Sequence, residues 1–240
     1  MKTPLKKQPA MIIALTICAC SCSLMLSRET NAQSHDSDPR VAVILDFEGA
    51  AQSKEANASW SEIKRGQILP VGSVVKTGSQ GKVDLYFRQI GTIIRLMPQT
   101  ELTLEKLHKE MKNGVLVKET VLDMKSGRIL AVVRVLVEDS KVEIKTPACS
   151  YLMPTAGVGR YDIRSDGTAL VGKKSRLSLK ALAGGKATTV EPGQKFSSKT
   201  AKVEQIDTKT LQELLGQMDE LQAIATALTP PPRPEELPKR

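Results

Sequence analysis

Between Val41 and about Ser197 the chain alternates short apolar runs with turn-forming residues, without a long stretch of helical periodicity. Strict alternation puts every second side chain on one face of a strand, and Val83, Leu85 and Phe87 follow this pattern. The same pattern recurs in the pairs Val142 and Ile144, and Leu177 and Leu179. Many short strands at this spacing predict an all-β fold, a sandwich or a solenoid-like stack, rather than alternating strands and helices.

Residue pairs that suit tight turns separate these strand-forming segments. Asn113-Gly114 is the clearest pair, because it fits a two-residue type I′ turn whose twist matches the flanking strands. It predicts a hairpin formed by residues 101–111 and 115–124. We expect the charged residues near its tip, Lys109, Glu110, Lys112 and Lys118, to protrude into solvent. Further turns are expected at Gly78–Gly81, Ser126-Gly127, Asp166-Gly167, Gly184-Gly185 and Pro192-Gly193.

The character of the sequence changes after Thr200. Residues 205–228 are expected to contain one helix, with Asp207 or Thr208 as its N-cap. Its apolar stripe is expected to dock on the β domain. The alternative is self-association, since the stripe also follows a short heptad pattern through Leu211, Leu214, Met218, Leu221 and Leu228. Residues 229–240 are rich in proline and are expected to form an extended, disordered tail.

The first 32 residues have the three-part layout of a secretory signal. Three lysines precede an uncharged apolar run from Ala10 to Leu26, and small residues lie near Ala32. Cleavage after Ala32 would remove residues 1–32 as a signal peptide and leave 33–40 as a flexible leader. Two alternatives stay open. The run could be retained as a membrane anchor, or Cys20 could carry a lipid, because residues 17–19 resemble part of a bacterial lipoprotein box.

Cysteine content and charge narrow the choice of function. Three of the four cysteines lie inside the apolar run, so Cys149 is expected to be a small buried residue and not half of a disulfide. The formal net charge is +9, but lysines and arginines are spread along the chain and aromatic residues make up only 3%. Stacking platforms for nucleic acid are therefore scarce, and no nucleic-acid partner is expected.

Residues 59–107 resemble the first half of the FecR domain, a bacterial extracytoplasmic β domain. That family shows a tryptophan, a leucine, a V/I-x-TG pair, an alternating strand and an R-L-x-P-x-T-E-L run. The positions that carry the resemblance are Trp60, Leu69, Val75, Thr77, Gly78, Val83, Leu85, Phe87, Gly91, Arg95, Leu96, Pro98, Thr100, Glu101 and Leu102.

The second half of the domain is similar as well. MKSGRILAVV, VEIKTP, AGVGRYDIRSDGTALV and VEPGQKF resemble the family's L-x-x-G, I-x-TP, VRGT-x-F-x-V and V-x-x-G segments, so the likeness covers residues 58–198. The chain departs from the family pattern at Ser73, at Arg88-Gln89-Ile90 and at Val158-Gly159-Arg160. The resemblance implies a FecR-like β domain at residues 41–200 that senses or scaffolds, without the cytoplasmic part with which family members control a sigma factor.

Residues with catalytic or metal-binding chemistry are scarce. His35 and His108 have no ligand pattern around them, and neither a phosphate-binding loop nor a nucleophile elbow is present in the sequence. We therefore expect no catalytic centre, no cofactor and no metal site. Trp60 is expected to pack in the core, with a surface anchor as the alternative. Thr77-Gly78 and Thr146-Pro147 are interpreted as backbone devices that end strands.

Together these features favour a non-catalytic, extracytoplasmic binding or scaffolding module of the bacterial envelope. Its expected partner is an envelope protein or polymer, and the candidate binding residues are Trp60, His108, Lys109, Lys112 and Lys118. The alternative is a membrane-tethered component of a cell-surface signalling system, in which the N-terminal run stays uncleaved. Contact with the membrane is expected only through that run or through a lipid anchor.

Overall fold

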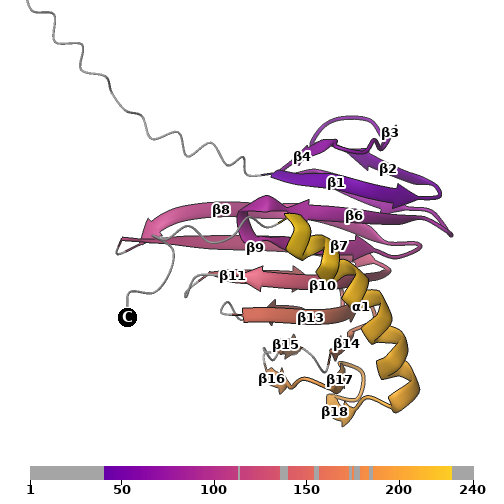
Figure 1. The fold of residues 1–240 in the computed structure, drawn as a ribbon, viewed down its shortest axis with the longest axis vertical. Coiled ribbons are helices and arrows are strands. Elements are labelled where there is room, and N and C mark those ends of the chain that lie inside the picture. The colour runs from indigo at the N-terminus through magenta and orange to yellow at the C-terminus, as the bar shows by residue number, and fades with distance from the viewer. Residues whose placement is uncertain are drawn as a thin grey trace, which may run out of the picture. The chain divides into compact units, whose positions relative to one another are not determined.

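The structure is a computed structural model that describes residues 41–112, 114–135, 140–153, 157–172, 175, 179–183 and 186–228. Within these residues, eighteen strands form two nine-stranded sheets, and one helix, α1 (Thr208–Leu228), follows them (Figure 1). The predicted all-β class with a single C-terminal helix is confirmed. The expected signal peptide, leader and proline-rich tail, together with Leu177 and the Gly184-Gly185 turn, lie outside the described residues.

The strands of each sheet follow one another in space nearly in chain order. Sheet A contains β4 (Ile68–Pro70), β1 (Val41–Glu48), β6 (Lys82–Phe87), β7 (Thr92–Leu96), β10 (Arg128–Val135), β13 (Gly157–Arg164), β14 (Thr168–Val171), β17 (Gln194–Ser197) and β18 (Lys202–Gln205). Sheet B contains β3 (Ser61–Glu62), β2 (Ala51–Lys54), β5 (Val74–Thr77), β8 (Glu101–Lys112), β9 (Val115–Ser126), β11 (Lys141–Lys145), β12 (Ser150–Met153), β15 (Leu179–Ala183) and β16 (Lys186–Val190).

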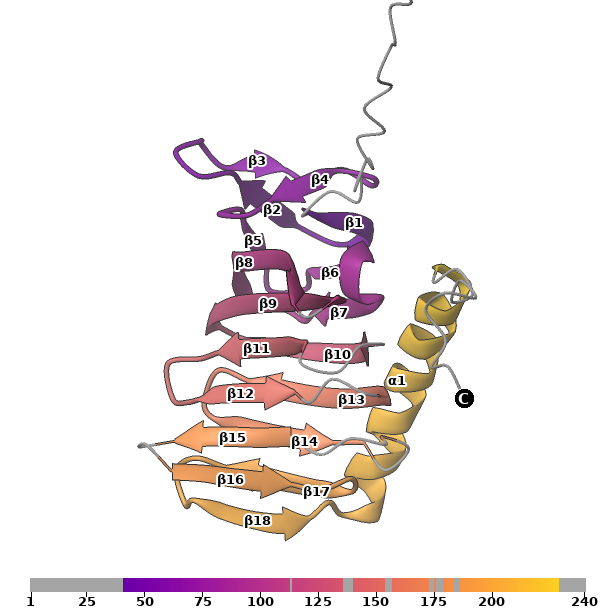
Figure 2. The same cartoon turned by 90° about the vertical axis from the view of Figure 1, so that its left-hand side faces the viewer.

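The chain passes back and forth between the two sheets as it advances along the stack (Figure 2). Hairpins such as β6–β7 in sheet A alternate with hairpins such as β8–β9 in sheet B. Nearly all described pairs are antiparallel, and β9 with β11 is the parallel one. The fold therefore combines the two layers of a sandwich with the progressive winding of a solenoid.

Alternating side chains fill the space between the sheets. Val83, Leu85 and Phe87 of sheet A are fully buried in the same cluster as Val142 and Ile144 of sheet B, as their alternation predicted. Most positions that carry the family resemblance are likewise buried between the sheets or lie in turns. Arg88–Ile90, where the sequence departs from the family pattern, form one 3₁₀ turn, η1, which ends at Gly91 with φ +58°.

The turns between the sheets stack along one side of the molecule. The Gly78 N–H donates to the Ala50 carbonyl at 2.8 Å, and the Gln99 N–H donates to the Gly78 carbonyl at 3.0 Å. Gly127 belongs to the same stack and has φ +91°, a conformation in which a Cβ would lie 2.3 Å from Thr100 Oγ1. Glycine is therefore required at this turn.

Helix α1 lies across the outer face of sheet A (Figure 2). Asp207 is its N-cap, since its Oδ1 accepts the Thr210 N–H at 2.9 Å. Leu214, Met218, Leu221 and Ala225 pack on outward side chains of sheet A that include Tyr86, Ile93, Leu130, Val132 and Leu170. The expected docking is confirmed. Self-association through this stripe would first require the helix to leave the sheet.

Candidate functional site

The β8–β9 hairpin extends beyond its neighbours in sheet B (Figure 1). Its two strands pair along their whole length, up to Lys112 opposite Val115, so the predicted hairpin is confirmed. Asn113 of the expected turn lies outside the described residues. Strand β5 pairs with β8 only at residues 101–103, and β11 pairs with β9 only from residue 119 onward. Among the described strands, the distal part of the hairpin is thus a two-stranded ribbon.

A bulge at Glu105 changes which side chains of β8 face the interior. The register shifts between Leu104 and Lys106, so Leu104 is buried before the bulge and Leu107 after it. One extra residue in a strand has this effect because side chains alternate with a period of two. Beyond the bulge, one face of β8 carries Leu107, Lys109 and Met111, and the other carries Lys106, His108, Glu110 and Lys112.

Two apolar side chains are exposed at the end of the hairpin. Met111 is 67% exposed, the largest value among the exposed large hydrophobic residues described, and Val115 is 46% exposed. Val115 lies opposite Lys112, whereas Met111 lies opposite Leu116, so the two side chains are on opposite faces of the ribbon. Sequence reasoning did not select either residue, although Val115 follows the expected turn directly and Met111 lies two residues before it.

On the face that carries Lys106 and His108, charged side chains form ion pairs nearer the base of the hairpin. Glu119 receives ion pairs from Lys106 and from Lys141, the latter at 2.7 Å. The hydrogen bond from Lys106, reinforced by that from Lys141, holds the pKa of Glu119 below its usual value. His108 Nε2 lies 3.5 Å from Glu110 Oε2. This face is therefore ordered by ion pairs at its base, and at its end Lys112 lies opposite the exposed Val115.

The structure brings four of the five predicted binding residues onto this hairpin, with one correction. His108, Lys112 and Lys118 are at least partly exposed, but Lys109 is only 7% exposed, so the expectation that it protrudes is wrong. The bulge explains the difference, because it places Lys109 on the face of Leu107. Lys109 and Lys118 lie opposite each other, and the Lys118 N–H donates to Ser140 Oγ at 3.0 Å.

Trp60 is the fifth predicted residue and lies elsewhere. It precedes β3, which is separated from β8 by β2 and β5. Its side chain is 38% exposed, and the Lys54 ammonium lies 5.0 Å from the ring centroid, a cation–π contact. The expectation that Trp60 packs in the core is therefore wrong. The structure does not place Trp60 with the hairpin residues.

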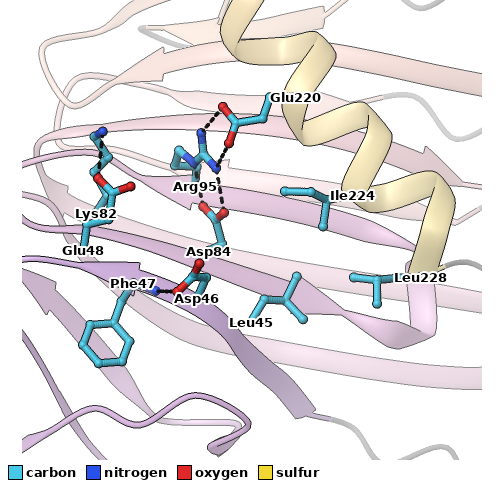
Figure 3. A pocket seen from close by; sticks show the side chains of 10 residues that line it. All are labelled: Leu45, Asp46, Phe47, Glu48, Lys82, Asp84, Arg95, Glu220, Ile224 and Leu228. Atoms are coloured by element: carbon cyan, nitrogen blue, oxygen red, sulfur yellow. Dashed lines mark hydrogen bonds and ion pairs between the residues drawn. The ribbon is translucent and has the colours of Figure 1, made fainter.

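A second feature is an open pocket between sheet A and the C-terminal half of α1, with a volume of about 330 Å³ (Figure 3). Arg95 lines the pocket and makes paired bonds to Asp84, both at 2.7 Å, and to Glu220 of α1, at 3.0 and 3.1 Å. Its other lining residues are Leu45, Asp46, Phe47, Glu48, Lys82, Ile224 and Leu228.

The ion pairs of Arg95 in this pocket join helix α1 to sheet A. The hydrogen bonds that Arg95 donates to Asp84 raise the pKa of Arg95, so the guanidinium stays charged. The hydrogen bond from Arg95 lowers the pKa of Glu220. Because both carboxylates already pair with Arg95, we interpret the cluster as a structural clamp. A second ion pair, Arg160 to Asp219 at 2.7 Å, holds the preceding residue of the helix.

The remaining residues singled out from the sequence have structural roles. Thr77 Oγ1 donates to the Met97 carbonyl at 2.7 Å and accepts the Thr100 N–H at 2.9 Å. Thr146 Oγ1 forms bonds with the backbone of Cys149 at 2.7 and 3.1 Å. Their interpretation as backbone devices is confirmed. Cys149 is buried with a free thiol, as expected.

Within the described part of the chain, histidine, cysteine and acidic side chains form no group of three or more that could hold a metal ion. Of the helices that the structure describes, none combines the length and the apolar character needed to cross a membrane. Comparisons of the chain with family models, curated proteins and solved structures found no match.

Proposed function

We propose that the chain is a non-catalytic, extracytoplasmic binding module of the bacterial envelope that engages a protein partner through the β8–β9 hairpin. The observation that carries the proposal is the exposure of Met111 and Val115 at the end of a ribbon that other described strands do not flank. The two side chains lie at one end of the hairpin, on its two faces, and methionine is enriched at protein interfaces.

Rigidity at the base of the hairpin also supports this role. Its proximal half is part of sheet B, where Leu102, Leu104 and Leu122 are fully buried. A binding element held by a rigid scaffold loses less conformational freedom when a partner binds. The secretory layout of residues 1–32 and the resemblance to the FecR domain support an extracytoplasmic location and a sensing or scaffolding role.

A shortened hairpin tests the proposal. In this variant residues 109–118 are replaced by Asn-Gly, which leaves His108 opposite Glu119 at the new turn. Wild type and variant are used to capture proteins from an envelope extract of the native host. A matched control carries Lys202→Ala and Gln205→Ala on the exposed edge strand β18.

The proposal expects the control, but not the shortened variant, to capture the same proteins as the wild type. Circular dichroism confirms beforehand that both variants keep their sheet content. If the shortened variant captures the same partners as the wild type, the hairpin is not the binding element and the proposal is refuted.

A further inference from the structure

Among the described strands, none lies beside the outer edge of β8 over most of the hairpin. Strand β5 pairs with residues 101–103, and Leu104 exchanges backbone bonds of 2.9 and 2.8 Å with Ser73 and Gly72. From Lys106 to Lys112, the described strand pairs of β8 all involve β9 on its other side. An edge of this kind offers backbone N–H and C=O groups to an extended segment of another protein.

The turn fixes which backbone groups point to this edge. In a two-residue hairpin the pair that flanks the turn, here Lys112 and Val115, is hydrogen-bonded. Because such pairs alternate along an antiparallel ladder, Glu110 and Lys106 also bond to β9, whereas Leu107 and Met111 direct their backbone groups outward. Leu104, before the bulge, also directs its N–H and C=O outward, to Ser73 and Gly72. The extra residue at Glu105 explains this, because it reverses the alternation between Leu104 and Lys106.

The two faces next to this edge differ in chemistry. On one face lie Lys106, which pairs with Glu119, His108 beside Glu110, and the exposed Lys112 near the turn. On the other face Met111 presents an exposed apolar side chain. An incoming strand alternates its side chains between these faces. The complementary segment therefore carries acidic residues at every second position and apolar residues between them.

The same charges act against self-pairing through this edge. In an antiparallel pair of β8 strands centred on Lys109, Lys106 of each copy would lie opposite Lys112 of the other. Like charges directly opposite each other destabilise a strand pair. Lysines on an edge thus discourage a second copy while they favour an acidic strand.

We propose that the outer edge of β8 between Lys106 and Lys112 is a strand-addition site for an extended protein segment in which acidic and apolar residues alternate. This inference rests on the proposed function and specifies how its partner binds. Main-chain bonds at Leu107 and Met111 supply affinity, and the exposed Lys112 selects an acidic residue of the partner.

Residue-resolved hydrogen exchange on the full chain tests this mode of binding. The probe is a nine-residue peptide of alternating valine and glutamate at millimolar concentration, and the control peptide has lysine in place of glutamate. We expect the valine–glutamate peptide to slow exchange at the amides of Leu107 and Met111 by about tenfold. The amide of Glu110, which already bonds to β9, should change little.

Two variants of one residue separate the backbone from the side chain. Met111→Pro removes the outward N–H, and Met111→Ala keeps it while it shortens the side chain. The proposal expects Met111→Ala to retain peptide protection at Leu107 and Met111→Pro to lose it, with sheet content unchanged in both.

Four results would overturn the strand-addition site. These are no protection with either peptide, equal protection by the lysine peptide, protection confined to other strands, and dimer formation through this edge in light scattering. Partner capture that depends on the hairpin but is equal in Met111→Pro and wild type would refute strand addition and leave the proposed function standing.

Discussion

Truncation of Leu221 to alanine should destabilise the whole domain, because this side chain joins the helix to sheet A. Leu221 is fully buried in the cluster that contains Ile93, Leu130 and Val132. The substitution removes three carbon atoms, worth about 0.8 kcal/mol each in transfer from water. The cavity left behind adds to this loss. The expected decrease in the free energy of unfolding is therefore about 3 kcal/mol.

Urea unfolding followed by two signals measures this effect. Far-ultraviolet circular dichroism reports on the strands and the helix, and the fluorescence of Trp60, the single tryptophan, reports on the neighbourhood of β3. Both transitions should move to lower urea by the same amount, because a cooperative domain unfolds as one unit. Leu228→Ala, the same truncation at a position 39% exposed, should cost less than about 1 kcal/mol.

An unchanged Trp60 transition in Leu221→Ala would refute this reasoning. That result would mean that the helix leaves sheet A before the sheets unfold, so that its packing adds nothing to their stability. The self-association alternative for the apolar stripe would then regain support, because Leu214, Met218 and Leu221 would become available.

Three further predictions concern the helix and its clamp. Gly216→Ala should raise the free energy of unfolding by about 1 kcal/mol, because a Cβ there meets no atom within 4 Å; an unchanged or lower urea midpoint would contradict this. Arg95→Met should lower the free energy of unfolding by about 3 kcal/mol, because the Asp84 side chain, which is only 8% exposed, loses its cation. Protonation of Asp84 in acid should reduce this loss of stability. A loss that is equally large in acid would argue against this cause. The lowered pKa of Glu220 contributes stability above the ordinary glutamate pKa of 4.5, and this contribution is lost as the pH falls through the lower folded value. In Glu220→Gln the free energy of unfolding should therefore fall less steeply in acid than in the wild type. An equally steep fall in both proteins would exclude this contribution.

Local pattern predicted much of the fold. Alternation identified Val83, Leu85 and Phe87 as one buried face, and Asn113-Gly114 located the hairpin to the residue. These features depend on neighbours in sequence, where side-chain period and turn chemistry act directly. The winding between two sheets could not be predicted in this way. Pairs such as β1 with β6 join residues far apart in sequence, and no local signal specifies them.

The misplaced residues have specific physical causes. The buried leucines of β8 fall at even positions, Leu102 and Leu104, before Glu105 and at an odd position, Leu107, after it. This break in the alternation could have predicted the bulge that places Lys109 on the buried face. The exposure of Trp60 depends on the edge position of β3, which only the sheet order determines. The pairing of Arg95 with Glu220 joins residues 125 positions apart, beyond the reach of any local pattern.

Site-specific photo-crosslinking in intact cells of the native host tests the central claim most directly. A photoreactive amino acid is placed at Met111 in the full chain, and in a control chain at the exposed residue Lys202 of β18. If the hairpin is the binding element, Met111 forms one predominant adduct with an envelope protein, and Lys202 does not. Adducts of equal yield at both positions, or none at Met111, would contradict the account.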